Sequence, residues 1–345
     1  ISDGFIKNIY KNSDNTNNKD ETLLRLKLLF LPNKKTNHTF SSYYIDLNNR
    51  YDAWTPDNNG YITYSDYQGY DTQKTRAISL KSNYDFINSK VTSISTYSVN
   101  NIIYSYDADW ANDDYWLDEH GWNIIDEGYA WSFTDYTKRE RINRSQEFRI
   151  KFNNITLGTY LSSIKEIDSR EGWLFSGLAN NIKSNYYIKN NALYLKMNFK
   201  INKNNILTAS IRNDCYKIEQ QLSYSSLNYY TYSYDNFNLP DENISDFNLF
   251  GGNINFFRLI DENFTFNMIL SSGYKTSGIN QSPNFSNNRK YKTEFNYNYE
   301  MGFTYNDDFS NFTFTSFYMD RKKPQLRLFV QFSPDPNSFD YATFN

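Results

Sequence analysis

Cysteine and long apolar runs are scarce in this sequence of 345 residues. The one cysteine, Cys215, cannot form an internal disulfide. No run of about 18 apolar residues occurs and the mean hydropathy is −0.77, so the sequence contains no transmembrane helix. The net charge of −3, the sequence pI near 5.6 and the lack of a basic patch argue against a nucleic-acid binder.

Motifs for catalysis are also missing. There is no Gly-x-Ser-x-Gly, no His-Glu-x-x-His, no phosphate loop and no Cys/His zinc spacing. The two histidines, His38 and His120, lie too far apart in sequence to be read as a metal pair. We therefore expect no enzyme activity, no cofactor and no metal centre.

Aromatic residues are abundant instead, at 19% of the chain, and they follow a period of two. From 291 to 305 one parity carries Tyr291, Phe295, Tyr297, Tyr299, Met301, Phe303 and Tyr305, and the other carries Lys292, Glu294, Asn296, Asn298 and Glu300. Period two over this length predicts one long strand with an apolar and a polar face. A membrane barrel strand, with lipid outside and a wet lumen inside, has this pattern. Strands of an aromatic-rich soluble sandwich are the alternative.

Short turns and long breaks alternate along the chain. Short turns are expected at 32–37, 87–89, 153–154, 202–205 and 260–262, and long breaks at 49–73, 106–135, 168–190 and 219–242. This rhythm predicts an all-β fold: an antiparallel up-and-down transmembrane β-barrel of about fourteen strands. The long breaks would lie outside the cell and the short turns in the periplasm.

The chain ends are expected to belong to an incomplete barrel. The first hairpin would join Asp3–Lys11 to Asp20–Leu31, and the last segments, Gln325–Phe332 and Ser338–Asn345, would end one strand and begin another. Because closure of a barrel removes its edges, neighbouring strands are expected to be missing at both ends.

Six short motifs add a resemblance to a known family. They are Tyr51 to Gly60, Ser105 to Trp116, Ser145-Gln-Glu-Phe-Arg149, Ser272 to Asn280, Tyr299-Glu-Met-Gly302 and Phe317-Tyr-Met-Asp-Arg321. In this order and at these intervals, the chain resembles the barrel of a TonB-dependent outer-membrane receptor of the proteobacterial iron-complex type. The resemblance covers nearly all 345 residues.

The resemblance implies more than the residues show. Such receptors enclose a plug domain in a 22-stranded barrel and import scarce bulky solutes, usually ferric siderophores and sometimes haem, cobalamin or glycans. Energy comes from the TonB–ExbB–ExbD complex through a short N-terminal box. Residues 1–345 carry neither plug nor box, so we expect the central part of the barrel alone. It would lie in the bacterial outer membrane, against lipid and lipopolysaccharide.

Candidate site residues fall into two groups. Aromatic rings in the long breaks are expected to stack on a ligand: Trp54, Trp110, Tyr115, Trp116 and Trp122. The break 106–135 is also acidic, and its carboxylates could hold a hard cation; the alternative is a solvated loop packed by its own aromatics. By strand parity, Lys196, Arg212 and Lys292 are expected to face the lumen.

The expected function is therefore uptake of a bulky scarce solute, in the first place a ferric siderophore, energised by TonB. Two alternatives remain open at the level of sequence. A passive porin-like channel would be a complete barrel with a constriction loop and no plug upstream. A surface glycan-binding or adhesion barrel would use the aromatic loops alone.

Overall fold

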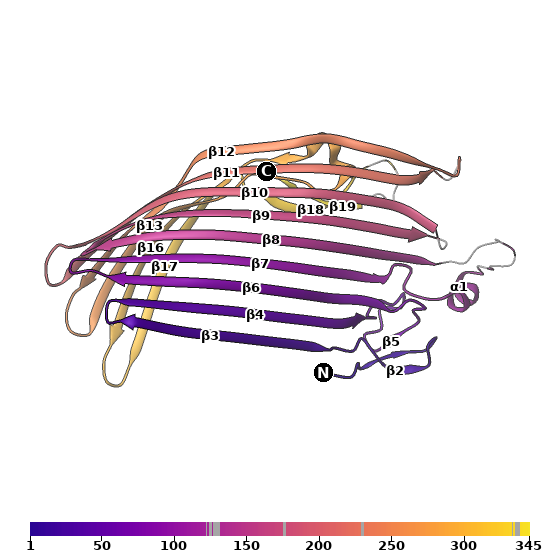
Figure 1. Cartoon of the computed structure of the whole chain (residues 1–345), viewed down its shortest axis with the longest axis horizontal. Coiled ribbons are helices and arrows are strands. Elements are labelled where there is room, and N and C mark those ends of the chain that lie inside the picture. Colours follow the sequence, from indigo (N-terminus) through magenta and orange to yellow (C-terminus); the bar gives the residue numbers. More distant parts are fainter. Residues whose placement is uncertain are drawn as a thin grey trace.

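One large antiparallel sheet makes up most of the chain (Figure 1). The computed structural model describes residues 1–121, 123, 126, 132–174, 177–228, 231–332, 334 and 339–345. The sheet contains β3 (Glu21–Asn33), β4 (Thr36–Tyr51), β6 (Gly69–Asp85), β7 (Ser89–Asp107), β8 (Phe133–Phe152), β9 (Ile155–Leu174), β10 (Gly177–Lys200), β11 (Asn205–Asn228), β12 (Ser233–Leu259), β13 (Phe264–Lys275), β16 (Glu294–Asn306) and β17 (Asn311–Lys322). These twelve strands pair in chain order from β3 to β17, which is an up-and-down topology.

Smaller elements lie outside the large sheet. They are β1 (Ile6–Asn8), β2 (Ser13–Thr16), β5 (Ile62–Thr63), α1 (Asp113–His120), β14 (Gly278–Ile279), the 3-10 helix η1 (Pro283–Asn288), β15 (Lys290–Tyr291), β18 (Leu326–Gln331) and β19 (Phe339–Phe344). β1 pairs with β2 and β5, β14 with β15, and β18 with β19. No helix among the described residues is long and apolar enough to cross a membrane.

Six short connections lie at one end of the sheet, on the left in Figure 1. They are 34–35, 86–88, 153–154, 201–204, 260–263 and 307–310. At the 153–154 turn Asn153 adopts φ 43°. Asparagine tolerates this left-handed conformation better than most residues, which explains why two residues suffice to reverse the chain. The expected short turns are found at this end. At the opposite end long connections join β4 to β6, β7 to β8 and β13 to β16, but only two residues separate β9 from β10 and four separate β11 from β12, so the expected alternation holds in part.

Two expected long breaks are strand instead of loop. β9 and β10 run through 168–174 and 177–190, and β11 and β12 run through 219–228 and 233–242. The apolar alternation fades in these stretches because neither face meets lipid there, while the backbone pairing continues without it. The sequence pattern therefore marked the end of the apolar band and not the end of the strand.

The ends of the chain also differ from expectation. The first segment contributes β1 to a small sheet and does not pair with β3, which instead forms its hairpin with β4. The last two segments pair with each other as β18 and β19, outside the large sheet. The sheet consequently has twelve strands where about fourteen were expected. The strand expected from 291 to 305 is also interrupted, at residues 292 and 293.

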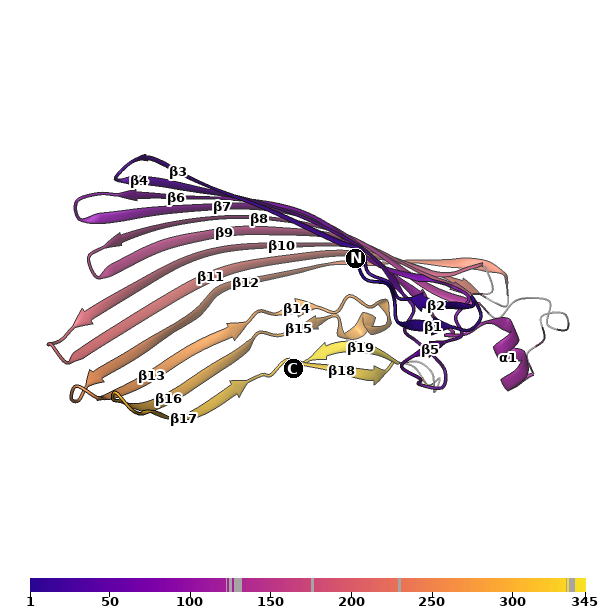
Figure 2. The same cartoon turned by 90° about the horizontal axis from the view of Figure 1, so that it is seen from below.

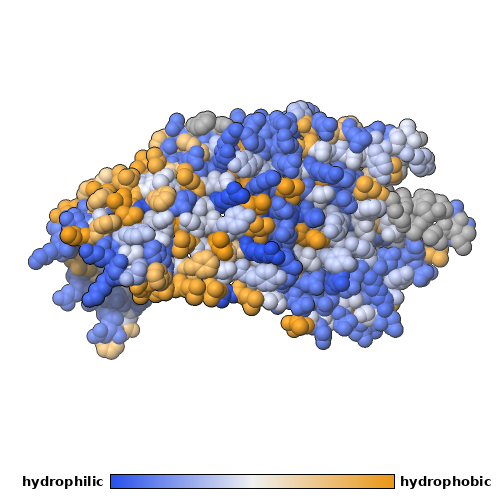
Figure 3. Space-filling view, viewed as in Figure 1, coloured by the Kyte–Doolittle hydropathy of each residue, from blue (hydrophilic) through white to orange (hydrophobic). Residues whose placement is uncertain are grey.

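The two faces of the sheet differ as the alternation predicted. On β10, Leu193 is 64% exposed on the outer face, whereas its neighbour Ala192 is 3% exposed on the other. Figure 3 shows the outer face, with apolar residues gathered toward the short turns and hydrophilic residues toward the opposite end. An apolar band limited to part of the strand length is typical of a membrane barrel wall.

Two segments fold back beneath the arch of the sheet (Figure 2). The first connects β13 to β16 and contains β14, η1 and β15; the second follows β17 and contains β18 and β19. We call them the inward segments, and the sheet face that they cover the lumen face. Much of the buried apolar surface lies here: Phe285 meets Phe332 and Phe344 edge-on, with ring centroids 6.3 Å apart in both pairs.

Candidate solute site in the lumen

A cavity of about 670 Å³ lies between the lumen face of β7 to β10 and the inward segments. The wall contributes Tyr104, Tyr106, Asp135, Thr137, Arg139, Asp168, Arg170, Ile182 and Ser184, and the inward segments contribute Ile279, Asn280, Gln281, Ser282, Tyr291, Arg327, Asp340, Tyr341 and Thr343. The lining is thus rich in tyrosine, arginine and aspartate. Such a surface suits a bulky polar solute better than a lipid or a purely apolar molecule.

Arginines on the wall side of the cavity already have carboxylate partners. Arg139 donates from Nε and Nη2 to Asp168, at 2.7 and 2.8 Å, and Arg170 donates from Nε to Asp135 at 3.0 Å. Two-pronged pairs of this kind fix both side chains in one orientation. The wall therefore presents a rigid and locally neutral set of charges.

Arg327, on an inward segment, differs from the wall arginines. Its guanidinium lies 4.8 Å from the ring centroid of Tyr341. No carboxylate in the part of the chain that the structure describes forms an ion pair with it. The nearby Asp340 accepts hydrogen bonds from Ser282 (2.6 Å) and Asn284 (3.1 Å). Arg327 is thus the cation of this cavity that remains available to an anionic group on a solute.

Side-chain amides hold the inward segments in place. Gln325 donates from Nε2 to the carbonyls of Thr276 (2.8 Å) and Lys292 (2.9 Å), and its backbone N–H donates to Glu294. Arg289 is buried and donates to Gln220 on β11 and to the carbonyl of Pro240 on β12. Because these bonds join both inward segments to the sheet, the cavity is defined by fixed contacts on each side.

Nearer the short turns, two clusters of polar side chains on the lumen face each span several strands. Arg212 makes a two-pronged pair with Asp214 at 2.6 and 2.9 Å, and Tyr274 donates to the same carboxylate. Arg212 also lies 5.6 Å from the Tyr160 ring centroid. In the second cluster Glu147 accepts hydrogen bonds from Arg149 and Tyr194.

Of the residues expected to face the lumen, Arg212 is therefore engaged within the wall. Lys196 lies opposite Thr156 and Ser210 on the same face. Lys292 lies in the interruption between β15 and β16, where strand parity no longer fixes its direction, and its side chain is exposed. None of the three lines the cavity.

The aromatic residues expected to bind ligand gather at the mouth but pack on one another. Trp54 and Trp110 stack with centroids 6.0 Å apart, Tyr115 lies 4.8 Å from Tyr64, and Trp116 donates from Nε1 to Asp109. They do not line the lumen cavity. Trp122 lies outside the described residues. Their ligand-binding role stays a prediction.

The acidic part of this loop is folded inward and bonded to itself. Asp107 accepts from Ser65 and from the backbone of Asp109, and Asp109 accepts from Phe133 N–H at 3.0 Å. Burial, reinforced by the neighbouring Asp107, raises the pKa of Asp109 to about 9. Burial and the charges of Asp107 and Asp113 raise the pKa of Asp66 to about 6. Among the described residues no three acidic, histidine or cysteine side chains are arranged to hold a metal ion.

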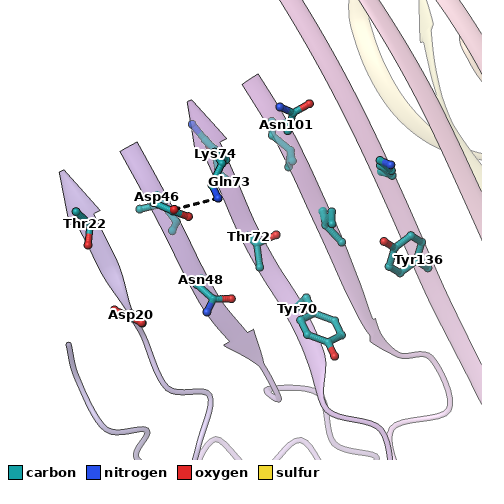
Figure 4. Close-up of a pocket in the computed structure, with 14 residues that line it drawn as sticks. Asp20, Thr22, Asp46, Asn48, Tyr70, Thr72, Gln73, Lys74, Asn101 and Tyr136 are labelled. Atoms are coloured by element: carbon teal, nitrogen blue, oxygen red, sulfur yellow. Dashed lines mark ion pairs between the residues drawn. The ribbon is translucent and has the colours of Figure 1, made fainter. Parts of the chain in front are cut away.

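A second hollow, of about 970 Å³, lies on the outer face near the mouth (Figure 4). Its lining includes Tyr70, Tyr136 and the ion pair between Lys74 and Asp46, whose N and O atoms are 3.2 Å apart. Because it opens away from the lumen, it does not lie on a path through the barrel.

Comparison of the sequence with known family models and with curated proteins gives no match. The fold does have solved counterparts. The ferric yersiniabactin uptake receptor FyuA of Yersinia pestis superposes with a TM-score of 0.76 at 16% identity, over 94% of this chain and 49% of that one. The copper transporter OprC gives 0.65 at 12% identity, over 99% and 49%. The ferric-catecholate import receptor Fiu of E. coli K12 gives 0.62 at 12%, over 94% and 54%.

The fold is that of a TonB-dependent outer-membrane receptor barrel, as the resemblance implied. The chain spans about half the length of these receptors. At these identities the comparison establishes the fold alone, and the solute of any one of these receptors cannot be assigned to this chain.

Several cavity residues were not singled out from the sequence. Asp168 and Arg170 lie in a stretch expected to be a long break, whereas Arg139, Arg327 and Tyr341 lie in segments expected to be barrel strands. The signal that could have found the wall residues was the density of alternating Arg, Glu and Asp from 135 to 170.

Proposed function

We propose that this chain forms part of the wall and the solute site of an outer-membrane uptake receptor for a bulky scarce solute, a ferric siderophore in the first place. The observation that carries the proposal is the lumen cavity. The inward segments, which fold back into the lumen of the receptor-type barrel, close this cavity on one side. Import receptors for iron chelates are among the structures that share this fold. A simple open channel has no need of such a lining.

The chemistry of the lining supports a chelate. Tyrosine rings offer flat contact surfaces and phenol groups, and Arg327 offers a positive charge to carboxylate or other anionic donor groups on the solute. The paired wall charges accept and donate hydrogen bonds without leaving a strong net charge. A metal chelate with a polar periphery matches this combination.

Partners follow from the same proposal. The apolar band supports a wall that lies in outer-membrane lipid, where lipopolysaccharide would be its neighbour. Energy for release of a tightly held chelate would come from TonB with ExbB and ExbD.

Uptake of radioactive iron by cells that make the full-length protein tests the proposal. With a panel of ferric siderophores, we expect at least one to enter only when the receptor gene and TonB are both intact. Thr137→Trp would fill the cavity and abolish that uptake. The matched variant Thr159→Trp, on the outer face of β9, should retain it. Uptake that persists without TonB would point to a passive channel instead.

A further inference from the structure

The charges that line the lumen cavity balance one another. Its charged side chains are three arginines and three aspartates, which together carry no net charge at neutral pH: Arg139, Arg170, Arg327, Asp135, Asp168 and Asp340. Neither lysine, glutamate nor histidine appears in the lining that the described residues form. A solute inside this cavity therefore meets no excess of positive charge.

The wall arginines are committed to buried carboxylates. The side chains of Asp168, which binds Arg139, and Asp135, which binds Arg170, are only 15% and 12% exposed. On the same strand as Asp168, Glu166 lies 3.6 Å from Arg139 and gives this arginine a second acidic neighbour. An anion that drew Arg139 or Arg170 away would leave these carboxylates buried without a counter-charge, which is strongly unfavourable. The wall therefore offers no cation to a solute.

The inward segments add one free cation and one acid. Arg327 lies on β18 and has no carboxylate partner among the described residues. Asp340 lies opposite Val330 on the same hairpin, three residues or about 10 Å along the strand from Arg327. A single negative group on a solute can pair with Arg327, but a second or third would lie in the cavity without a partner. Because an unpaired charge is strongly disfavoured away from water, the lining tolerates one anionic group.

The approach to the cavity is acidic. Residues 106–121 begin at Tyr106, in the cavity lining, and carry six acidic side chains and no lysine or arginine. Three of the acids, Asp114, Asp118 and Glu119, are exposed on α1, which lies beyond the ends of the long strands in Figure 2. Asp118 and Glu119 lie in the last turn of this helix, where the helix dipole disfavours negative charge, so helix stability does not explain them. A negative field at the mouth slows the arrival of polyanions.

We infer that the solute is a ferric chelate with no net charge or a single negative charge, and that polyanionic chelates are excluded. The balanced lining, the single free cation and the acidic approach all act in this direction. Iron(III) held by three hydroxamates is uncharged and fits this class, whereas iron(III) held by three catecholates carries three negative charges and does not. The inference rests on the proposed function, because it assigns the charge of the solute that the same cavity takes up.

Sorting chelates by charge tests the inference. The purified full-length protein is titrated with the panel of ferric siderophores used for uptake, and binding is followed by quenching of tryptophan fluorescence. We expect the tightest binder to be uncharged or singly negative, and a tris-catecholate of similar size to bind at least about a hundredfold more weakly. A tris-catecholate as the tightest binder would overturn the inference and leave the proposed function intact. A panel without any binder would instead contradict the proposed function, and the inference with it.

A variant that frees two wall cations should reduce this preference. Asp135→Asn, Asp168→Asn keeps the shape of both side chains but removes the charges that neutralise Arg170 and Arg139. The ratio of tris-catecholate affinity to tris-hydroxamate affinity should rise about tenfold for each freed arginine. Asp135→Asn alone, which frees one arginine, covers the case in which the double variant does not fold.

A matched variant separates the cavity from the rest of the lumen face. Glu147→Gln, Asp214→Asn removes two charges of the same kind from the clusters nearer the short turns, where they neutralise Arg149 and Arg212. Neither acid lines the cavity, so the affinity ratio should stay unchanged. An unchanged ratio in a folded cavity variant, or an equal rise in this matched variant, would each contradict charge selection by the cavity lining.

Discussion

The side-chain amide of Asn280 pairs with the backbone of Thr343 in both directions. Asn280 Nδ2 donates to the Thr343 carbonyl at 3.0 Å, and Thr343 N–H donates to Asn280 Oδ1 at 2.8 Å. The same amide also donates to the Asn288 carbonyl. One buried side chain therefore forms the pair of backbone hydrogen bonds that a neighbouring strand would form. It joins the two inward segments across 63 residues of sequence.

Replacement of Asn280 should loosen the floor of the lumen cavity. Asn280→Ala removes the paired bonds and leaves backbone groups of Thr343 without their partner, at a cost of about 1–3 kcal/mol. We expect faster protease cleavage of the β18–β19 hairpin with little change in barrel melting temperature. Asn287→Ala, on the nearby 3-10 helix η1 and exposed, is the matched control. Equal cleavage rates in the two variants would contradict the linking role of Asn280.

Removal of Arg327 should weaken binding of anionic chelates selectively. Arg327→Ala deletes the unpaired cation, and a charged hydrogen bond is worth about 1.5–3 kcal/mol, so affinity should fall roughly ten- to a hundredfold. Binding of an uncharged chelate should change little, and Arg327→Lys should recover part of the loss. Arg258→Ala, at the turn end of β12, serves as the control. Titration calorimetry on the full-length protein measures all four cases.

The mouth loop should open more readily as the pH rises. Asp109 has its pKa raised by burial from 3.8 to about 9, so the closed loop holds a proton that the open loop releases between these values. The contribution of the buried Asp109 carboxyl to the stability of the closed loop is complete below about pH 4 and is lost as the pH approaches 9. We expect proteolysis near Trp110 to be faster at pH 8 than at pH 5, after correction for protease activity. Asp109→Asn should flatten this dependence, and an unchanged profile would exclude Asp109 as its source.

A charge on the outer face should oppose insertion. Leu193 lies in the apolar band, and Leu193→Arg should destabilise the folded barrel in lipid by about 2–4 kcal/mol if it lies near the midplane. Ser162→Arg places the same side chain on the lumen face of the neighbouring strand, where water hydrates the charge. The loss of folding free energy should therefore be far smaller. Urea unfolding in lipid vesicles compares the two. Similar midpoints would mean that the faces are assigned incorrectly.

The sequence predicted the wall well where one face meets lipid. In β10 the alternation of Leu193, Leu195 and Met197 with Tyr194 and Lys196 corresponds to the two observed faces. Such a pattern depends only on the solvent on each side of the strand, which is a local property. The short turns were predictable for the same reason, since Asn-Asn supplies its own turn geometry.

The cavity was not predictable in this way. Arg139 and Asp168 become partners only through the register between β8 and β9, and Arg327 reaches the lumen only because an inward segment folds back. The parity argument also failed at Lys292, where a two-residue interruption ends the strand. Pairing across strands and the folding back of connections are tertiary facts that a period of two does not encode.

The long hairpins of β9 to β12 have a consequence for where a solute is first met. β10 has 24 residues, about 79 Å of paired strand at roughly 3.3 Å each, while the lipid-facing part of a barrel strand needs only about 9–11 residues. Some 40 Å of strand length therefore remains, which at a tilt of roughly 40° corresponds to about 30 Å of height above the bilayer. A molecule that diffuses toward the cell would contact these extended hairpins before it reached the lipid.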